Sequence, residues 1–112
     1  MTPLLLLCSC PDRTRARLLA QSLVEARLAA CVSLLPSVES VYRWKGVIES
    51  SNEVLLLIKS QAARFEEIER HILAHHPYEL PEILAVQADS GLDRYLAWID
   101  EETSPPESEA RR

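Results

Sequence analysis

Glycine is almost absent from this 112-residue chain, which contains only Gly46 and Gly91. Phosphate-binding loops of the P-loop and dinucleotide types need closely spaced glycines, so the sequence argues against both classes of nucleotide enzyme. No Ser-His-Asp or Cys-His set stands out either. A general acid–base pair of His76 with Glu79 or Glu82 is the one enzymatic alternative left open. We therefore expect a protein that is not an enzyme.

Positive charge and long apolar runs are also scarce. Lys and Arg number 12 against 17 acidic residues, and no segment concentrates them beside aromatics, which argues against a nucleic-acid partner. The apolar run at residues 4–7 is too short for a secretory or lipoprotein signal, and no Lys or Arg precedes it. Three cysteines, an odd number, argue against a disulfide framework. These absences predict a cytoplasmic protein without a membrane partner.

What is present is an alternation of strand-like and helix-like apolar patterns. Asp12 and Ser60 stand where the first two helices should begin and are expected to cap them. Ser90 with Asp93 resembles a capping box for a third helix. Strands are predicted at residues 4–10, 30–44, 47–59 and 83–86, and helices at about 13–27, 61–76 and 91–102.

This order of elements predicts an α+β fold of the ferredoxin-like type, βαββαβ, with an extra C-terminal helix. One domain should occupy residues 1–102, since a chain of this length holds a single core. Residues 103–112 are rich in Pro, Glu, Ser and Arg and are expected to form a disordered polar tail.

The second and third strands should form a long central β-hairpin around a tight turn at Lys45-Gly46. Arms of a dozen or more residues span about 40 Å, whereas a domain of this size has a radius of gyration of only about 13 Å. The hairpin must therefore project beyond the core. Pro36 predicts a bulge in its first arm, and Trp44 is expected to lie between subunits. Exposed strand edges and an apolar tip predict a closed homo-oligomer.

A corner at His75–Ile83 carries the densest set of functional groups. Pro77 should end the preceding helix at His75 or His76, so two imidazoles, a phenol and two carboxylates lie close together. Such a corner binds a metal or a small ligand, or it is a well-tied turn. His76 also falls on the apolar stripe of its helix, which is typical of a packed histidine, and His71 is expected to face solvent.

Five segments resemble the CutA divalent-cation-tolerance family: residues 26–32, 40–46, 55–59, 76–83 and 95–99. The resemblance implies a homotrimer similar in architecture to the PII signalling proteins, with hairpins pairing between subunits. It also implies a copper-binding role in the response to metal ions. Thiolate and imidazole ligands together suit copper(I) or zinc, and we expect zinc to be the less preferred occupant. By motif, the implied ligands are Cys8, His75 and His76.

The chain departs from the family pattern at Cys10, which shares a strand face with Cys8 and adds a second sulfur. The predicted strand order places the end of the first strand and the end of the second helix at the same end of the domain. A PII-like sensor that binds a small anion or nucleotide between subunits is the alternative, with Lys45, Arg43 and Lys59 as candidate residues. Cys31 is expected to be a simple core residue.

Overall fold

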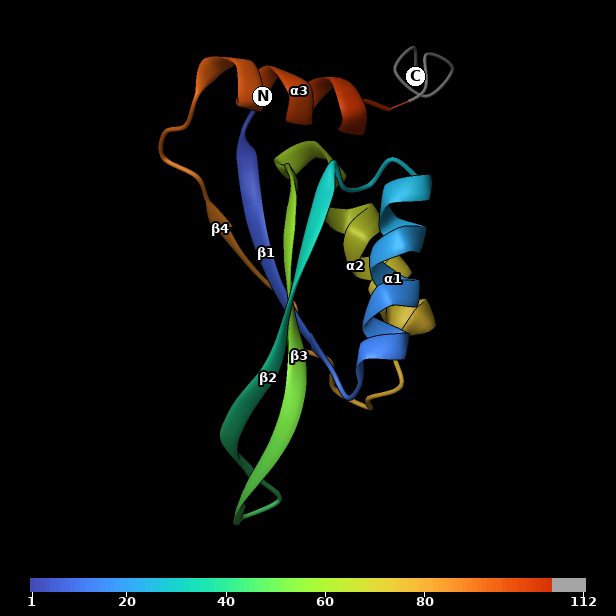
Figure 1. Ribbon diagram of the computed structural model, residues 1–112, viewed down its shortest axis with the longest axis vertical. Helices are drawn as coiled ribbons and strands as arrows, with labels where there is room; N and C mark the ends of the chain where they lie inside the picture. The colour runs from blue at the N-terminus through green and yellow to red at the C-terminus, as the bar shows by residue number, and fades with distance from the viewer. Residues whose placement is uncertain (106–112) are drawn as a thin grey trace.

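The computed structural model describes residues 1–105 and confirms the ferredoxin-like α+β architecture (Figure 1). Four antiparallel strands form one sheet in the order β2-β3-β1-β4. The elements are β1 (Pro3–Cys10), α1 (Arg13–Glu25), β2 (Cys31–Trp44), β3 (Val47–Gln61), a 3-10 helix (Ala62–Arg64), α2 (Phe65–His75), β4 (Leu84–Gln87) and α3 (Asp93–Thr103). No helix among these residues is long and apolar enough to cross a membrane.

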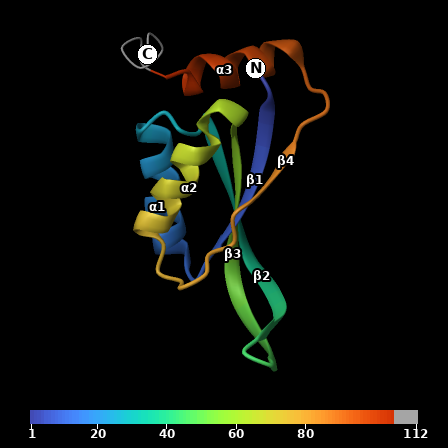
Figure 2. The same ribbon diagram turned by 180° about the vertical axis from the view of Figure 1, so that it is seen from behind.

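The core lies between one face of the sheet and the helices α1 and α2, which both cover that face (Figure 2). Alternate side chains of a strand point to opposite faces, and every second residue of β1 faces the helices. The core-facing residues are Leu4, Leu6, Cys8 and Cys10 of β1, Val54, Leu56 and Ile58 of β3, Ala16, Leu19 and Leu23 of α1, and Ile68 and Ile72 of α2. The last two core-facing positions of β1 are therefore sulfur side chains.

The helix starts follow the sequence prediction only in part. Asp12 caps α1 as expected, because its Oδ1 accepts a hydrogen bond from the amide of Arg15 at 2.8 Å. Ser60 does not cap α2: it is still in β3, opposite Leu4, and its hydroxyl donates to the Leu28 carbonyl at 2.6 Å. The capping box predicted at Ser90 is also wrong, since α3 begins after Leu92 without a side-chain cap.

The hairpin of β2 and β3 projects well beyond the helices (Figure 1), and the molecule is 48 Å along its longest axis. Lys45 and Gly46 both have positive φ, 50° and 83°, which is typical of the two-residue turn that suits the twist of paired strands. The predicted bulge is confirmed by a register shift between Leu35 and Val38, where Ser37 has a φ of 60°.

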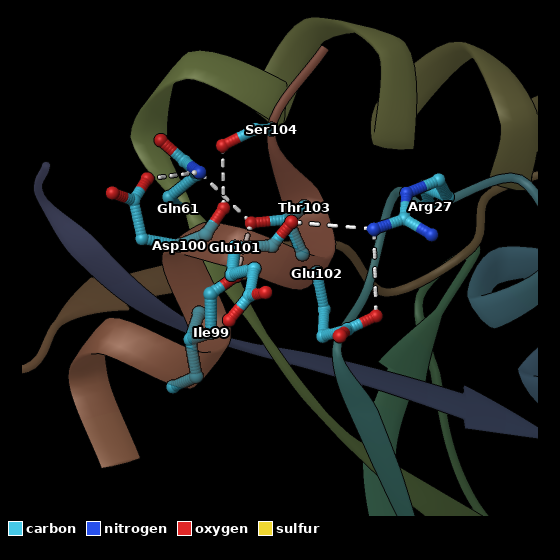
Figure 3. Close-up of polar contacts among 8 residues, drawn as sticks. All are labelled: Arg27, Gln61, Ile99, Asp100, Glu101, Glu102, Thr103 and Ser104. Atoms are coloured by element: carbon cyan, nitrogen blue, oxygen red, sulfur yellow. Dashed lines mark hydrogen bonds and ion pairs between the residues drawn. The ribbon is translucent and has the colours of Figure 1, made fainter. Parts of the chain in front are cut away.

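The end of α3 is tied to the rest of the domain by a group of polar contacts (Figure 3). The Gln61 side-chain amide donates to Thr103 Oγ1 at 2.8 Å and to Asp100 Oδ1 at 3.0 Å. Arg27 contacts the Glu101 carbonyl and the Glu102 carboxylate. Thr103, the first residue of the expected tail, is fully buried as the last residue of α3; residues 106–112 of that tail lie outside the described residues.

Thr103→Val should lower the free energy of unfolding by about 1–2 kcal/mol, because the buried Gln61 amide loses an acceptor while the side-chain shape is retained. Chemical denaturation followed by circular dichroism measures this difference. Thr14→Val, at an exposed position of α1, is the control and should change stability by less than about 0.5 kcal/mol. Equal stability of Thr103→Val and the parent would show that this contact does not hold α3.

Candidate metal centre

Three potential metal ligands meet where β1 ends and α2 ends. Cys8 and Cys10 come from the core face of β1, and His76 is the first residue after α2. One ligand atom from each of the three lies within 4.8 Å of the others. Both cysteines are buried, whereas His76 is partly exposed. The antiparallel strand order thus brings sulfur and imidazole together across 66 residues of sequence, as the topology predicted.

His76 is oriented by hydrogen bonds on both sides of its ring. The amide of Tyr78 donates to His76 Nδ1 at 3.1 Å, so Nδ1 must be an acceptor and the ring proton is on Nε2. Nε2 lies 2.7 Å from the Ser9 carbonyl oxygen, to which it donates, and 3.8 Å from Cys10 Sγ. A metal bound at Nε2 would therefore replace the hydrogen bond to Ser9.

The two sulfurs share protons unequally. The pKa of the Cys8 thiol lies well above its usual range, chiefly because of its hydrogen bond to Cys10 and then because of burial. The same hydrogen bond lowers the pKa of Cys10, although burial opposes this shift. The first proton therefore leaves the pair from Cys10, whose sulfur becomes the thiolate that a soft metal ion needs.

Two carboxylates and a phenol flank the sulfur pair. Glu53, which is buried, accepts a hydrogen bond of 2.7 Å from the Tyr78 hydroxyl. Burial and this contact raise the pKa of Tyr78 well above its usual range. Burial, with the neighbouring charge of Glu53, raises the pKa of Glu82. Both carboxylates also raise the pKa of Cys8, so their negative charge reaches the sulfurs and favours a cation there.

Of the three ligands that the family resemblance implied, His75 does not join Cys8 and His76. His75 Nδ1 contacts the His71 carbonyl oxygen at 2.7 Å, and the His75 ring stacks on that of His71 with 4.3 Å between centroids. His71 does not simply face solvent, because its Nε2 lies 2.7 Å from Ser22 Oγ. Cys31 is half-buried on β2, with Lys59 Nζ 3.8 Å from its sulfur.

The three cationic residues expected for a sensor site between subunits do not all lie together within one chain. Lys45 lies over the Trp44 ring at the hairpin turn, 5.7 Å from its centroid. Arg43 is nearby, opposite Ile48. Lys59 is at the other end of β3, where its ammonium group donates to Ser33 Oγ. The described residues therefore bring the histidine corner together with β1, whereas Lys59 lies at the opposite end of β3 from Arg43 and Lys45.

The donor set of Cys8, Cys10 and His76 fits a thiophilic metal. Metal–sulfur and metal–nitrogen bonds of about 2.3 and 2.0 Å place ligand atoms of a tetrahedral site roughly 3.5–3.8 Å apart. Spacings of up to 4.8 Å therefore need only a small inward movement of side chains. Thiolate and imidazole ligands select copper(I) and zinc over calcium and magnesium, which prefer oxygen.

Comparisons with known proteins agree with this architecture. The family model of the CutA1 divalent ion tolerance protein matches residues 4–102. The divalent-cation tolerance protein CutA of Pectobacterium atrosepticum is 43% identical over 95 residues, which cover 85% of this chain and 86% of that protein. The chloroplastic protein CutA of Arabidopsis thaliana is 41% identical over 93 residues, or 83% of this chain, but the chain spans only 51% of its length.

Two solved structures share the fold at full length. CutA from Xylella fastidiosa has a TM-score of 0.88 and 44% identity, with coverage of 91% of this chain and 98% of that chain. CutA1 from Oryza sativa has a TM-score of 0.91 and 31% identity, with coverage of 95% and 97%. The family match over almost the whole domain and the relatives of about 40% identity lead to one conclusion: the chain belongs to the CutA1 divalent ion tolerance family.

Proposed function

We propose that this chain is a copper-binding protein of the response to metal ions, and that it holds the ion with Cys8, Cys10 and His76. The observation that carries the proposal is the convergence of their three ligand atoms within 4.8 Å. The buried sulfurs give preference to copper(I), with zinc as the weaker occupant. The Glu53 and Glu82 carboxylates add negative charge beside the sulfurs. This role is one of binding and needs no catalytic step.

We also propose that it acts as a homotrimer. β2 is an edge strand of 14 residues, and among residues 1–105 only β3 pairs with it. A long unpaired edge favours association with another strand. β4, at the other edge, pairs with β1 over four residues only and exposes Leu84 and Val86. Both edges of the sheet are therefore free to meet a second copy of the chain.

We place the protein in the cytoplasm, because its three cysteines are free thiols and a reducing compartment keeps sulfur ligands available. The name of the Arabidopsis relative places that protein in the chloroplast, so an in-cell localisation experiment with a fluorescent fusion tests the compartment of this one.

A copper(I) titration of the reduced protein against a competing chelator tests the metal role. One ion per chain is expected. His76→Ala should weaken copper(I) binding by about a hundredfold, because it removes a direct metal ligand and not merely a residue that orients one. His75→Ala should bind copper(I) like the parent, since the His75 ring contacts His71. Equal losses in both variants would favour Cys8, His75 and His76 as the ligand set. Parent-like binding by His76→Ala would remove the histidine from the site.

A further inference from the structure

A hollow of about 280 Å³ lies where α1 begins and the hairpin leaves the core, between the first turns of α1 and the bulge of β2. Figure 1 shows the N-terminal end of α1 at the end of the domain from which the hairpin projects. The hollow is lined by Arg13 and Arg17 of α1, Leu34 and Pro36 of β2, and Val54 of β3. None of these five residues belongs to the candidate metal centre.

The polar wall of the hollow consists of two arginines on the same face of α1. Arg13 and Arg17 are four residues apart on α1, so their side chains leave the same face of the helix about 5–6 Å apart at Cβ. Among residues 1–105, neither guanidinium forms an ion pair with a carboxylate. Arg15 differs, because it points to another side of the helix and lies 3.7 Å from the Asp12 carboxylate. Two neighbouring cations without a counter-charge favour an anion between them.

The preference for an anion rests on the two guanidinium groups, because the Asp12 carboxylate already caps the N-terminal end of α1. Two planar guanidinium groups match the oxygens of a phosphate better than a single cation does.

The opposite wall is apolar. Leu34 and Val54 face the hollow from the sheet, and Pro36 has no amide hydrogen to donate. The register shift between Leu35 and Val38 interrupts the pairing of β2 with β3 beside it. A ligand that fills the hollow therefore needs an apolar part as well as an anionic one, and the volume limits it to a small molecule.

We propose that this hollow binds a small organic phosphate, with the phosphate between Arg13 and Arg17 and a flat apolar group against Leu34, Pro36 and Val54. The inference is independent of the metal site, since it shares no residue with it. Phenyl phosphate is the probe that carries both features, while inorganic phosphate and phenol each carry one of them.

Amide chemical-shift mapping of the metal-free, full-length protein with phenyl phosphate tests the location. The largest shifts are expected at the four lining residues that have an amide hydrogen, Arg13, Arg17, Leu34 and Val54, and not around His76. Binding by phenyl phosphate should be at least about tenfold tighter than by inorganic phosphate or phenol, which corresponds to about 1.4 kcal/mol. The absence of shifts at these residues, or equal binding of phenyl phosphate and inorganic phosphate, would overturn the proposal.

Isothermal titration of variants tests the arginines. The double variant Arg13→Gln, Arg17→Gln should bind phenyl phosphate at least about tenfold more weakly, whereas Arg15→Gln, a matched change two residues from each, should bind within about twofold of the parent. Equal weakening in both proteins would point to general charge rather than to a site, and would overturn the assignment. His76→Ala should bind phenyl phosphate like the parent, so that a failure here is distinct from a failure of the metal proposal.

Discussion

Replacement of both Cys8 and Cys10 by serine is expected to weaken copper(I) binding by at least about a thousandfold, or roughly 4 kcal/mol. The change removes both sulfur ligands and leaves one imidazole, which alone has no marked preference for a monovalent soft ion. Both side chains are fully buried, with exposed fractions of 0% and 1%. The hydroxyls would need new hydrogen-bond partners in the core, so some loss of stability is expected as well.

Chelator competition with copper(I) measures this loss, and the single variants divide it between the sulfurs. Cys10→Ser should be at least as damaging as Cys8→Ser, because Cys10 gives up its proton more readily and its sulfur is 3.8 Å from His76 Nε2. The double variant Cys8→Ala, Cys10→Ala separates ligand loss from the burial of hydroxyls.

Cys31→Ser is the matched control, since Cys31 lies on β2 beside Lys59 and outside the site. It should bind copper(I) like the parent. Retention of parent-like binding by the Cys8, Cys10 double variants would contradict the proposed ligands and leave the corner with a structural role only.

Sequence patterns predicted an element of the fold correctly where the local preference of the residues agreed with the packing around them. The apolar run of β1 and the Asp12 cap of α1 are confirmed because nothing in the tertiary structure competes with them. Ser60 failed as a cap because β3 continues past it: pairing with β1 extends to Gln61 opposite Pro3, and the Ser60 hydroxyl meets Leu28 instead. Strand pairing outweighs a capping preference worth about 1 kcal/mol.

The candidate site was predictable in outline but not in its members. Strand direction was enough to bring Cys8 and His76 to the same end, and the period of a strand was enough to put Cys10 beside Cys8. Which of two adjacent histidines turns inward depends on the backbone where α2 stops. His76 has an extended ψ of 139°, which lets its ring reach Ser9, while His75 is still helical and bonds to His71. The helical period already placed His76 on the apolar stripe, but it cannot supply the backbone angle that carries the ring to Ser9.

The pairing of Glu53 with Tyr78 had no sequence signal at all. The two residues are 25 apart, and Glu53 precedes an apolar run in which a carboxylate would normally face solvent. Its burial becomes understandable only from the ladder, where Val54 pairs with Cys10 at the last position of β1. Glu53 precedes Val54 on β3 and so lies beside the corner that carries Tyr78. The Tyr78 hydroxyl donates a hydrogen bond to the Glu53 carboxylate, which would otherwise be buried without a partner.

The hairpin tip leads to the prediction about assembly. Val41, which is 68% exposed, and Ile48, which is 66% exposed, share one face of the hairpin, while Val47 and Trp44 share the other. The tip projects away from its own core (Figure 1), and Val41 and Ile48 are left uncovered by the other described residues of the chain. Ile48→Lys should therefore disrupt the proposed trimer, because a buried ammonium group without a partner costs several kcal/mol at each interface.

Light scattering after size-exclusion chromatography measures the effect at micromolar concentration. The parent should have three times the 12.7 kDa mass of the chain, and Ile48→Lys should shift towards a single chain with its circular dichroism spectrum retained, since Ile48 is exposed within the chain. Leu18→Lys is the matched control: Leu18 is 65% exposed on α1, away from the hairpin, and its variant should stay trimeric. A monomeric parent would contradict the trimer itself. A trimer that tolerates Ile48→Lys as well as Leu18→Lys would place the contact between subunits elsewhere, because an exposed position accepts a lysine at little cost.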